Sequence, residues 1–258
     1  MGRKRRHITI YDTSSWIFNR MADVYDARPA YPAGLVDALV AIADGVGTRV
    51  LDIGAGIGHL ALPLAQRGLD VGAVEPAKAM LERLQLSAGN QGVTLHTLHA
   101  AAEALPFASP CFDLALISDA LHFVDAELTS TELRRVLVPR GALAIVTCEY
   151  TETPFMRDIR SAVSQSSDRR PRDVTQAIRR LAALANVRLT HKSTFCDETP
   201  VDQSTLERIL KSVSFIGPAM NSARFATLRQ RLLALPHAPV WARTFTLRAG
   251  RRHSAKMG

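Results

Sequence analysis

Between residues 50 and 147 the chain alternates short apolar runs with segments of helical periodicity, and this pattern constrains the fold more than any other feature. Five runs have the length and composition of buried strands: 50–53, 71–74, 93–98, 114–117 and 142–147. Apolar residues at helical spacing recur between them. Such alternation is typical of a mostly parallel sheet with helices on both faces. We therefore predict a doubly wound, Rossmann-like α/β fold.

The rhythm changes after residue 150. Arginine-rich helical stretches near 155–185 and 202–234 are mixed with two alternating runs, 187–195 and 240–247. The 258 residues could form one large domain or two small ones. Because we find neither an internal repeat nor a convincing linker, we predict a single α/β domain with helical additions.

One glycine-rich loop carries the strongest functional signal. Asp52-Ile53-Gly54-Ala55-Gly56-Ile57-Gly58 directly follows the first apolar run and precedes a predicted helix. Glycines there allow a sharp turn and close approach of a ligand, and a helix N-terminus offers free N–H groups. Glu75 ends the second run, where a carboxylate can bind ribose hydroxyls. Asp52, at the end of an apolar strand, requires a partner such as an ammonium group or backbone N–H groups.

Two classes of ligand compete for this loop. A dinucleotide site favours G-x-G-x-x-G, and here His59 stands where the last glycine of that motif would be. A carboxylate just before the glycines would repel a pyrophosphate but suits a zwitterionic amino acid group. The loop therefore favours S-adenosylmethionine over NAD. A phosphate-binding P-loop is excluded, because no Gly-Lys-Ser/Thr follows.

Several segments resemble, in order, the motifs of class I S-adenosylmethionine-dependent methyltransferases. These segments are 50–68, Glu75-Pro76, 102–107, 112–114, 121–123 and 135–137. The similarity is greatest to the small-molecule branch (methyltransferase domain 11-like) that includes the ubiquinone and menaquinone-type enzymes. The resemblance covers residues 16–148 and implies a seven-stranded sheet with an antiparallel last strand. Residues 187–195 and 240–247 would then be the last two strands.

The resemblance also implies roles for individual residues. Asp52, Gly54, Ala55 and Gly56 would hold the methionine part of the cofactor, and Glu75 the ribose. The remaining residues implied to contact the cofactor are Pro76 and Met80 along the adenine, Ala101 and Ala102 at the adenine edge through their backbone, and Ser118 beside the methionine part. Two positions depart from the family pattern: Ala101 replaces a frequent Asp, and Arg140 replaces the first glycine of the usual Pro-Gly-Gly turn.

The resemblance divides the predicted domain, 1–258, into functional segments. Residues 15–45 would form an N-terminal lid, in which Tyr25 and Arg28 are candidate cofactor contacts, since an arginine could pair with the methionine carboxylate. The other segments are a flexible basic arm at 1–14, the cofactor-binding core at 46–150, substrate-cap helices with the last two strands at 151–250, and a flexible tail at 251–258.

His122 is the candidate catalytic residue. An imidazole has a suitable pKa for deprotonating a hydroxyl, and His122 follows the fourth run near the expected point of methyl delivery. The alternative is a histidine held structurally between loop and helix, which we favour because the family has a histidine here across varied substrates. Methyl transfer from a sulfonium requires alignment and exclusion of water more than a catalytic side chain.

The net charge of +8 raises the question of nucleic-acid binding. Residues 8–150 carry 9 basic and 16 acidic side chains, whereas residues 151–250 carry 16 basic and 8 acidic ones. A basic second half could face an anionic substrate or be a solvated helical surface, and charge runs usually mark the latter. Ser118-Asp119-Ala120-Leu121 is not the motif of amino-directed base methylators, and aromatic residues make up only 6%.

We therefore predict a methyltransferase acting on a small molecule, by O-, N- or C-methylation. The alternatives are a methyltransferase of RNA or another macromolecule, and a non-catalytic cofactor-binding protein. Three widely spaced cysteines without a C-x-x-C pattern predict neither a disulfide framework nor a metal site. No apolar run approaches the ~18 residues of a membrane span, and a polar segment follows the basic N-terminus, so we expect a cytoplasmic protein.

Overall fold

The computed structural model describes residues 16–108, 110–164, 174–235 and 238–253. Its centre is one seven-stranded sheet with the order β3-β2-β1-β4-β5-β7-β6. The strands are β1 Arg49–Ile53, β2 Asp70–Val74, β3 His96–Leu98, β4 Phe112–Ser118, β5 Leu137–Tyr150, β6 Val187–Pro200 and β7 Val240–Arg252. The pairs from β3 to β5 are parallel, and β7 runs antiparallel to both β5 and β6. This arrangement confirms the predicted fold class.

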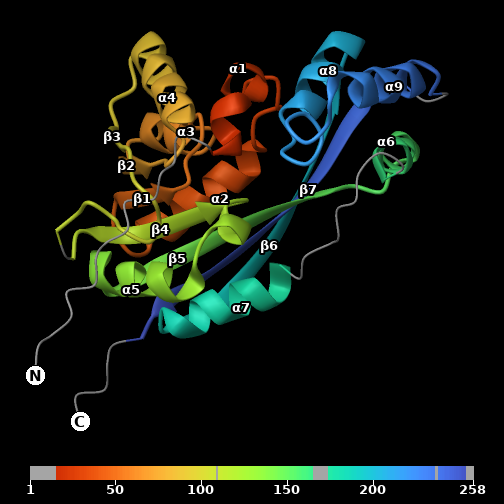
Figure 1. The fold of residues 1–258 in the computed structure, drawn as a ribbon. Coiled ribbons are helices and arrows are strands. Elements are labelled where there is room, and N and C mark those ends of the chain that lie inside the picture. The colour runs from red at the N-terminus through yellow and green to blue at the C-terminus, as the bar shows by residue number, and fades with distance from the viewer. Residues whose placement is uncertain (1–15, 109, 165–173, 236–237, 254–258) are drawn as a thin grey trace, which may run out of the picture.

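Helices cover both faces of the sheet (Figure 1). In chain order they are η1 Ile17–Arg20, α1 Ala22–Tyr25, α2 Ala33–Asp44, α3 Ala61–Gln66, α4 Lys78–Gln91, η2 Leu121–Phe123, α5 Ala126–Val136, α6 Pro154–Ser164, α7 Val174–Leu184, α8 Gln203–Lys211 and α9 Ser222–Leu233. Buried residues of α2, α3 and α4 join one core cluster, and those of α5 and α7 join a second. Neighbouring residues of one strand enter opposite clusters, as Val50 and Leu51 do, which explains why the strands read as continuous apolar runs.

A third core cluster lies beyond the end of the sheet at which β5 ends and β7 begins. It joins α6, α8 and α9 with Trp241 of β7, and we call these elements the cap (Figure 1). Helix α8 also contacts α1 of the N-terminal segment. The cap therefore stands at the same edge of the sheet as the carboxyl ends of the parallel strands.

Three predicted segment boundaries differ from the structure. Helix α7 packs against α5 and β6 and buries Leu181 on the sheet, so it is not part of the cap. Helix α2 buries Leu35 and Leu39 against the sheet, so the predicted lid at 15–45 contains a core helix. The predicted tail at 251–258 begins inside β7, where Arg251 donates to the Gly45 carbonyl at 2.6 Å. The predicted arm at 1–14 and residues 254–258 lie outside the described residues.

None of the helices in the described residues combines the length and the apolarity that crossing a membrane requires.

The turn before the paired part of β5 forces Arg140 into a backbone conformation that suits glycine. Arg140 has φ +66°, and its side chain is exposed. A side chain in this left-handed region costs on the order of 1 kcal/mol because Cβ approaches the following carbonyl oxygen. The family pattern has glycine here for this reason, and Arg140 retains the turn at an energetic cost.

We expect Arg140→Gly to raise the free energy of unfolding by roughly 0.5–1 kcal/mol, since relief of the strain exceeds the added chain entropy of glycine. Urea unfolding would measure the change. Arg140→Ala removes the charge but keeps Cβ, and it should show no comparable gain. Equal stabilisation by both variants would instead assign the effect to charge.

Candidate active site

The loop between β1 and α3 turns sharply at the carboxyl end of the sheet. Gly54 has φ +75°, and its N–H donates to the Val74 carbonyl at 2.9 Å. A Cβ added to Gly54 would lie only 2.8 Å from Cβ of Ala120. Gly58 has φ +89°, and an added Cβ would collide with Leu84 of α4. Gly54 thus lets the loop lie against Ala120 beyond the end of β4, while Gly58 lets it pack against Leu84 of α4.

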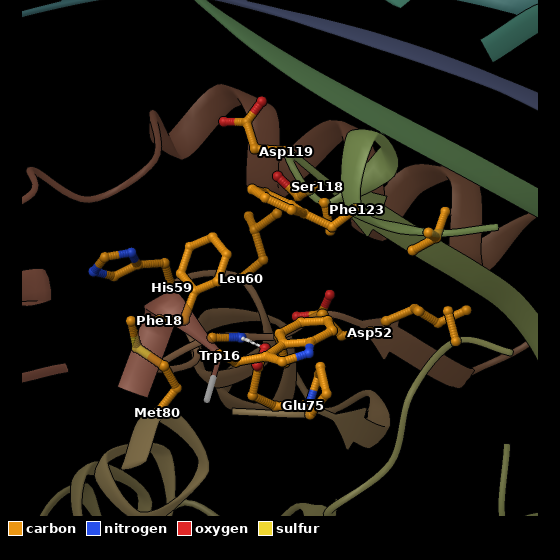
Figure 2. A pocket seen from close by; sticks show the side chains of 18 of the residues that line it. Trp16, Phe18, Asp52, His59, Leu60, Glu75, Met80, Ser118, Asp119 and Phe123 are labelled. Carbon is orange, nitrogen blue, oxygen red and sulfur yellow. Dashed lines mark hydrogen bonds between the residues drawn. The ribbon is translucent and has the colours of Figure 1, made fainter. Parts of the chain in front are cut away.

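This loop forms one wall of a cavity of about 840 Å³, which we call the first cavity. Figure 2 shows Asp52 and Glu75 on one side of it, with Trp16 beside them and Ser118 and Asp119 on the opposite side. The cavity lies where the strand order reverses between β1 and β4. Open α/β sheets bind their ligands at such a switch point.

Two buried carboxylates face the first cavity. Asp52 is 2% exposed and Glu75 is 5% exposed. Glu75 accepts hydrogen bonds from the N–H groups of Gly56, at 2.9 Å, and Ala77, at 2.8 Å. Burial raises the pKa of Glu75. Burial and the nearby charge of Glu75 raise the pKa of Asp52 to about 7.

Among the described residues, no lysine, arginine or histidine forms an ion pair with either carboxylate. An ionised buried carboxylate is costly unless a positive charge or strong donors compensate it. The site therefore suits a ligand that brings its own cation, such as an ammonium group, and disfavours a pyrophosphate. These two acceptor groups fit the ammonium group and the ribose hydroxyls of S-adenosylmethionine.

Most of the residues predicted for the cofactor lie together around the first cavity. They are Tyr25, Asp52, Gly54, Ala55, Gly56, Glu75, Pro76, Met80, Ala102 and Ser118. Ser118 is hydrogen-bonded through Oγ to the hydroxyl of Tyr31 at 2.8 Å. Ala101, Arg28 and His122 are not among the residues that line this cavity.

Arg28 and His122 instead line a second cavity of about 1280 Å³. The two cavities share six lining residues, and they therefore adjoin: Phe18, Tyr25, Tyr31, His59, Asp119 and Phe123. The ring centroids of His122 and Phe123 are 3.9 Å apart. Arg28, predicted as a contact of the cofactor carboxylate, is thus placed in the neighbouring space.

Two residues that were not predicted to belong to the site, Asp119 and His59, border both cavities. Asp119 has φ +49°, and its carboxylate accepts from the N–H of Cys148 at 2.7 Å. Burial raises the pKa of Asp119 to about 6. Burial and the charges of Arg28 and Arg243 lower the pKa of His59 to about 4, so its ring is neutral at pH 7. The available signal for Asp119 was its position directly after Ser118, at the end of β4.

Comparison with known proteins finds a family match for the middle of the chain. Residues 51–145 match the model of a methyltransferase domain. An uncharacterized methyltransferase of Mycobacterium bovis is 40% identical over 119 residues, and the alignment covers 46% of this chain and 46% of that protein. The chain thus matches about half the length of this curated relative.

Solved structures share the fold over most of the chain. A putative type II methyltransferase from Anaeromyxobacter dehalogenans has 19% identity and a TM-score of 0.59, covering 88% of this chain and 99% of that one. A geranyl diphosphate methyltransferase, solved with GPP and sinefungin, has 16% identity and a TM-score of 0.53, covering 85% of this chain and 78% of that one. The fold is that of the class I methyltransferases.

The raised pKa of Asp52 predicts a pH-dependent affinity for S-adenosylhomocysteine. Because this pKa lies above the ordinary value of 3.8, protonation stabilises the free protein, and this stabilisation is lost as the pH rises through about 7. A ligand ammonium favours the ionised form. Calorimetry should therefore show affinity rising roughly eightfold between pH 6 and 7.5, in proportion to the ionised fraction of Asp52.

The Asp52→Asn variant serves as the control. It should bind S-adenosylhomocysteine more weakly and show little change across the same pH range. A wild-type affinity that stays constant with pH would mean that Asp52 is already ionised in the free protein. An equal rise in the variant would assign the titration to another group, with Asp119 as the first candidate.

Proposed function

We propose that this protein transfers the methyl group of S-adenosylmethionine to a small molecule bound in the second cavity. The observation that carries the proposal is the pair of buried carboxylates, Asp52 and Glu75, which face the first cavity and form no ion pair within the described residues. The match of residues 51–145 to a methyltransferase domain supports the same activity, since such domains use this cofactor in general.

Different residues around the first cavity would bind different parts of the cofactor. Asp52 would hold the ammonium group through a charge-assisted hydrogen bond. Oε1 of Glu75 accepts from the N–H of Ala77, and Oε2 accepts from the N–H of Gly56. Each oxygen has a second lone pair that could accept from a ribose hydroxyl. Pro76, Met80 and the backbone near Ala102 would line the adenine.

The bound cofactor supplies a methyl group that is already activated by the positive sulfur. The chain must align the acceptor and exclude water. Phe18 and Phe123 pack edge to face with ring centroids 4.9 Å apart, and both line the two cavities. They form an apolar wall at the place where cofactor and acceptor would meet.

Asp119 is the better placed of two candidate proton acceptors. It borders both cavities, whereas His122 lines only the second. With a pKa of about 6, Asp119 is mostly ionised at pH 7 and could accept a proton or a hydrogen bond from an acceptor hydroxyl or amine. We therefore assign the proton-accepting role first to Asp119 and retain His122 as the alternative.

Contacts around the second cavity favour a small acceptor over a polymer. Arg28 hydrogen-bonds to Ser212 next to α8. Arg243 of β7 donates to the carbonyls of Pro29, at 2.9 Å, and Ala30, at 2.7 Å. These bonds attach the N-terminal segment to the cap and to the sheet. The second cavity is therefore walled from several sides, which suits a compact ligand.

A labelling experiment tests the proposal. The protein would be incubated with methyl-labelled cofactor and, separately, with the metabolite and RNA fractions of an extract from the organism that encodes it. We expect label in a small molecule that mass spectrometry can identify. Label confined to RNA would favour the macromolecular alternative, and absence of both label and cofactor binding would refute the proposal.

We expect Glu75→Gln to weaken binding of S-adenosylhomocysteine about 10- to 100-fold, because the amide loses one acceptor oxygen and the negative charge. Calorimetry would measure the change. Glu82→Gln, on the exposed face of α4, is the matched control and should bind as the wild type does. An unchanged affinity in Glu75→Gln would remove Glu75 from the ribose site.

We expect Asp119→Asn to lower kcat about 100-fold with the identified acceptor, because the amide cannot accept a proton. The affinity for S-adenosylhomocysteine should change little. His122→Asn, measured beside it, should have the smaller effect on kcat. The reverse order of the two variants would transfer the proton-accepting role to His122.

A further inference from the structure

The second cavity contains an arginine, Arg28, that forms no ion pair within the described residues, although the carboxylate of Asp119 lines the same cavity. Arg28 donates from Nε to Ser212 Oγ at 2.8 Å, from Nη2 to the Ser212 carbonyl at 2.6 Å, and from Nη1 to the Tyr25 hydroxyl at 3.0 Å. Its guanidinium also lies over the Tyr25 ring, 4.2 Å from the centroid. All of these partners are neutral.

The other arginines of the second cavity differ from Arg28 in this respect. Arg243 forms an ion pair with Asp197, and Arg160 forms one with Glu152. Within the described residues, no carboxylate lies within ion-pair distance of Arg28, and two of its five N–H groups have no hydrogen-bond partner. A guanidinium stays charged at every relevant pH, so a partly buried one without a counter-ion is an anion-binding group.

The electrostatics of the second cavity agree with this assignment. Three arginines and one carboxylate, Asp119, are among its lining residues. Burial, and then the charges of Arg28 and Arg243, lower the pKa of His59 beside this cavity. The first cavity has the opposite character, since Asp52 and Glu75 face it. The two neighbouring spaces therefore select groups of opposite charge.

A third cavity, of about 810 Å³, extends the second one into the cap. The two share Tyr150, Arg160, Phe215 and Trp241. Apolar side chains such as Ile159 of α6 and Leu210 of α8 form the rest of its wall. An acceptor that reaches Arg28 could therefore place an apolar part between these helices.

We propose that the methyl acceptor is an anionic amphiphile, with a carboxylate or similar anionic group bound by Arg28 and an apolar part in the third cavity. This inference rests on the proposed function, because it takes the second cavity as the acceptor site. Arg28 then acts in acceptor binding. It does not bind the cofactor carboxylate, the role that the sequence analysis gave it.

Octanoate and its neutral amide, octanamide, are suitable probes, because they differ in charge but hardly in size. Calorimetry at pH 7.5 with protein saturated by S-adenosylhomocysteine should show octanoate binding at least tenfold more tightly than octanamide. Butyrate keeps the charge but lacks most of the chain, and it should also bind at least tenfold more weakly than octanoate.

Three variants assign the discrimination to Arg28. Arg28→Gln should bind octanoate and octanamide equally and keep the wild-type affinity for S-adenosylhomocysteine. Ser212→Ala loses one tie between Arg28 and α8 but retains the charge, so it should still prefer octanoate. Arg231→Gln, exposed on α9, is the matched surface control and should bind all ligands as the wild type does.

Several results would overturn the inference. These are equal binding of octanoate and octanamide by the wild type, absence of binding by either, an unchanged preference in Arg28→Gln, or a matching loss of S-adenosylhomocysteine affinity in that variant. The last would return Arg28 to the cofactor carboxylate. If Arg28→Gln does not fold, the comparison of octanoate with octanamide in the wild type still tests whether the second cavity prefers an anion. Failure of the wild type to bind S-adenosylhomocysteine would refute the proposed function instead, and the same probes on the free protein would then decide the anion site alone.

Discussion

The parallel pairing of β1 with both β2 and β4 is the constraint on which the rest of the site depends. It brings three carboxyl strand ends to one edge, and the connections from β1 and β4 leave toward opposite faces of the sheet. Backbone at this edge cannot continue the ladder, so its side chains and N–H groups are available to a ligand. This pairing explains why one cavity is lined by Asp52, Glu75 and Ser118, which are far apart in the sequence.

Acidic and basic side chains line different cavities at this edge of the sheet. Two carboxylates, Asp52 and Glu75, face the first cavity, while the guanidinium of Arg28 faces the neighbouring one. Neither charge is neutralised by an ion pair within the described residues. Each is costly in the free protein and becomes favourable only when a ligand of opposite charge arrives. Asp119 stands at the boundary, where a cationic cofactor and an anionic acceptor would meet.

The sequence predicted the sheet well because its evidence is local. Apolar runs and glycines mark the strand ends, and the strand ends determine where Asp52 and Glu75 must lie. The bond from Arg28 to Ser212 could not be predicted, because the two residues are 184 positions apart and no periodicity reports such a contact. Helix α7 was assigned to the cap because its amphipathic pattern shows that one face is buried but not which surface that face covers. Asp119 was overlooked because its pKa depends on burial, which three dimensions decide.

The attachment of the cap to the N-terminal segment depends on an arginine that also faces the second cavity. Arg28 and Arg243 attach the N-terminal segment to α8 and to β7 through neutral oxygens, so the wall of the second cavity is held by the same guanidinium that would bind an acceptor. An anion at Arg28 would supply the charge that Ser212 and Tyr25 do not provide, and it would leave their hydrogen bonds in place. The acceptor would thus meet a wall that these hydrogen bonds already hold in place. Acceptor specificity would then come from Arg28 and the residues around it, which lie outside the cofactor motifs, and not from the fold that the chain shares with other methyltransferases.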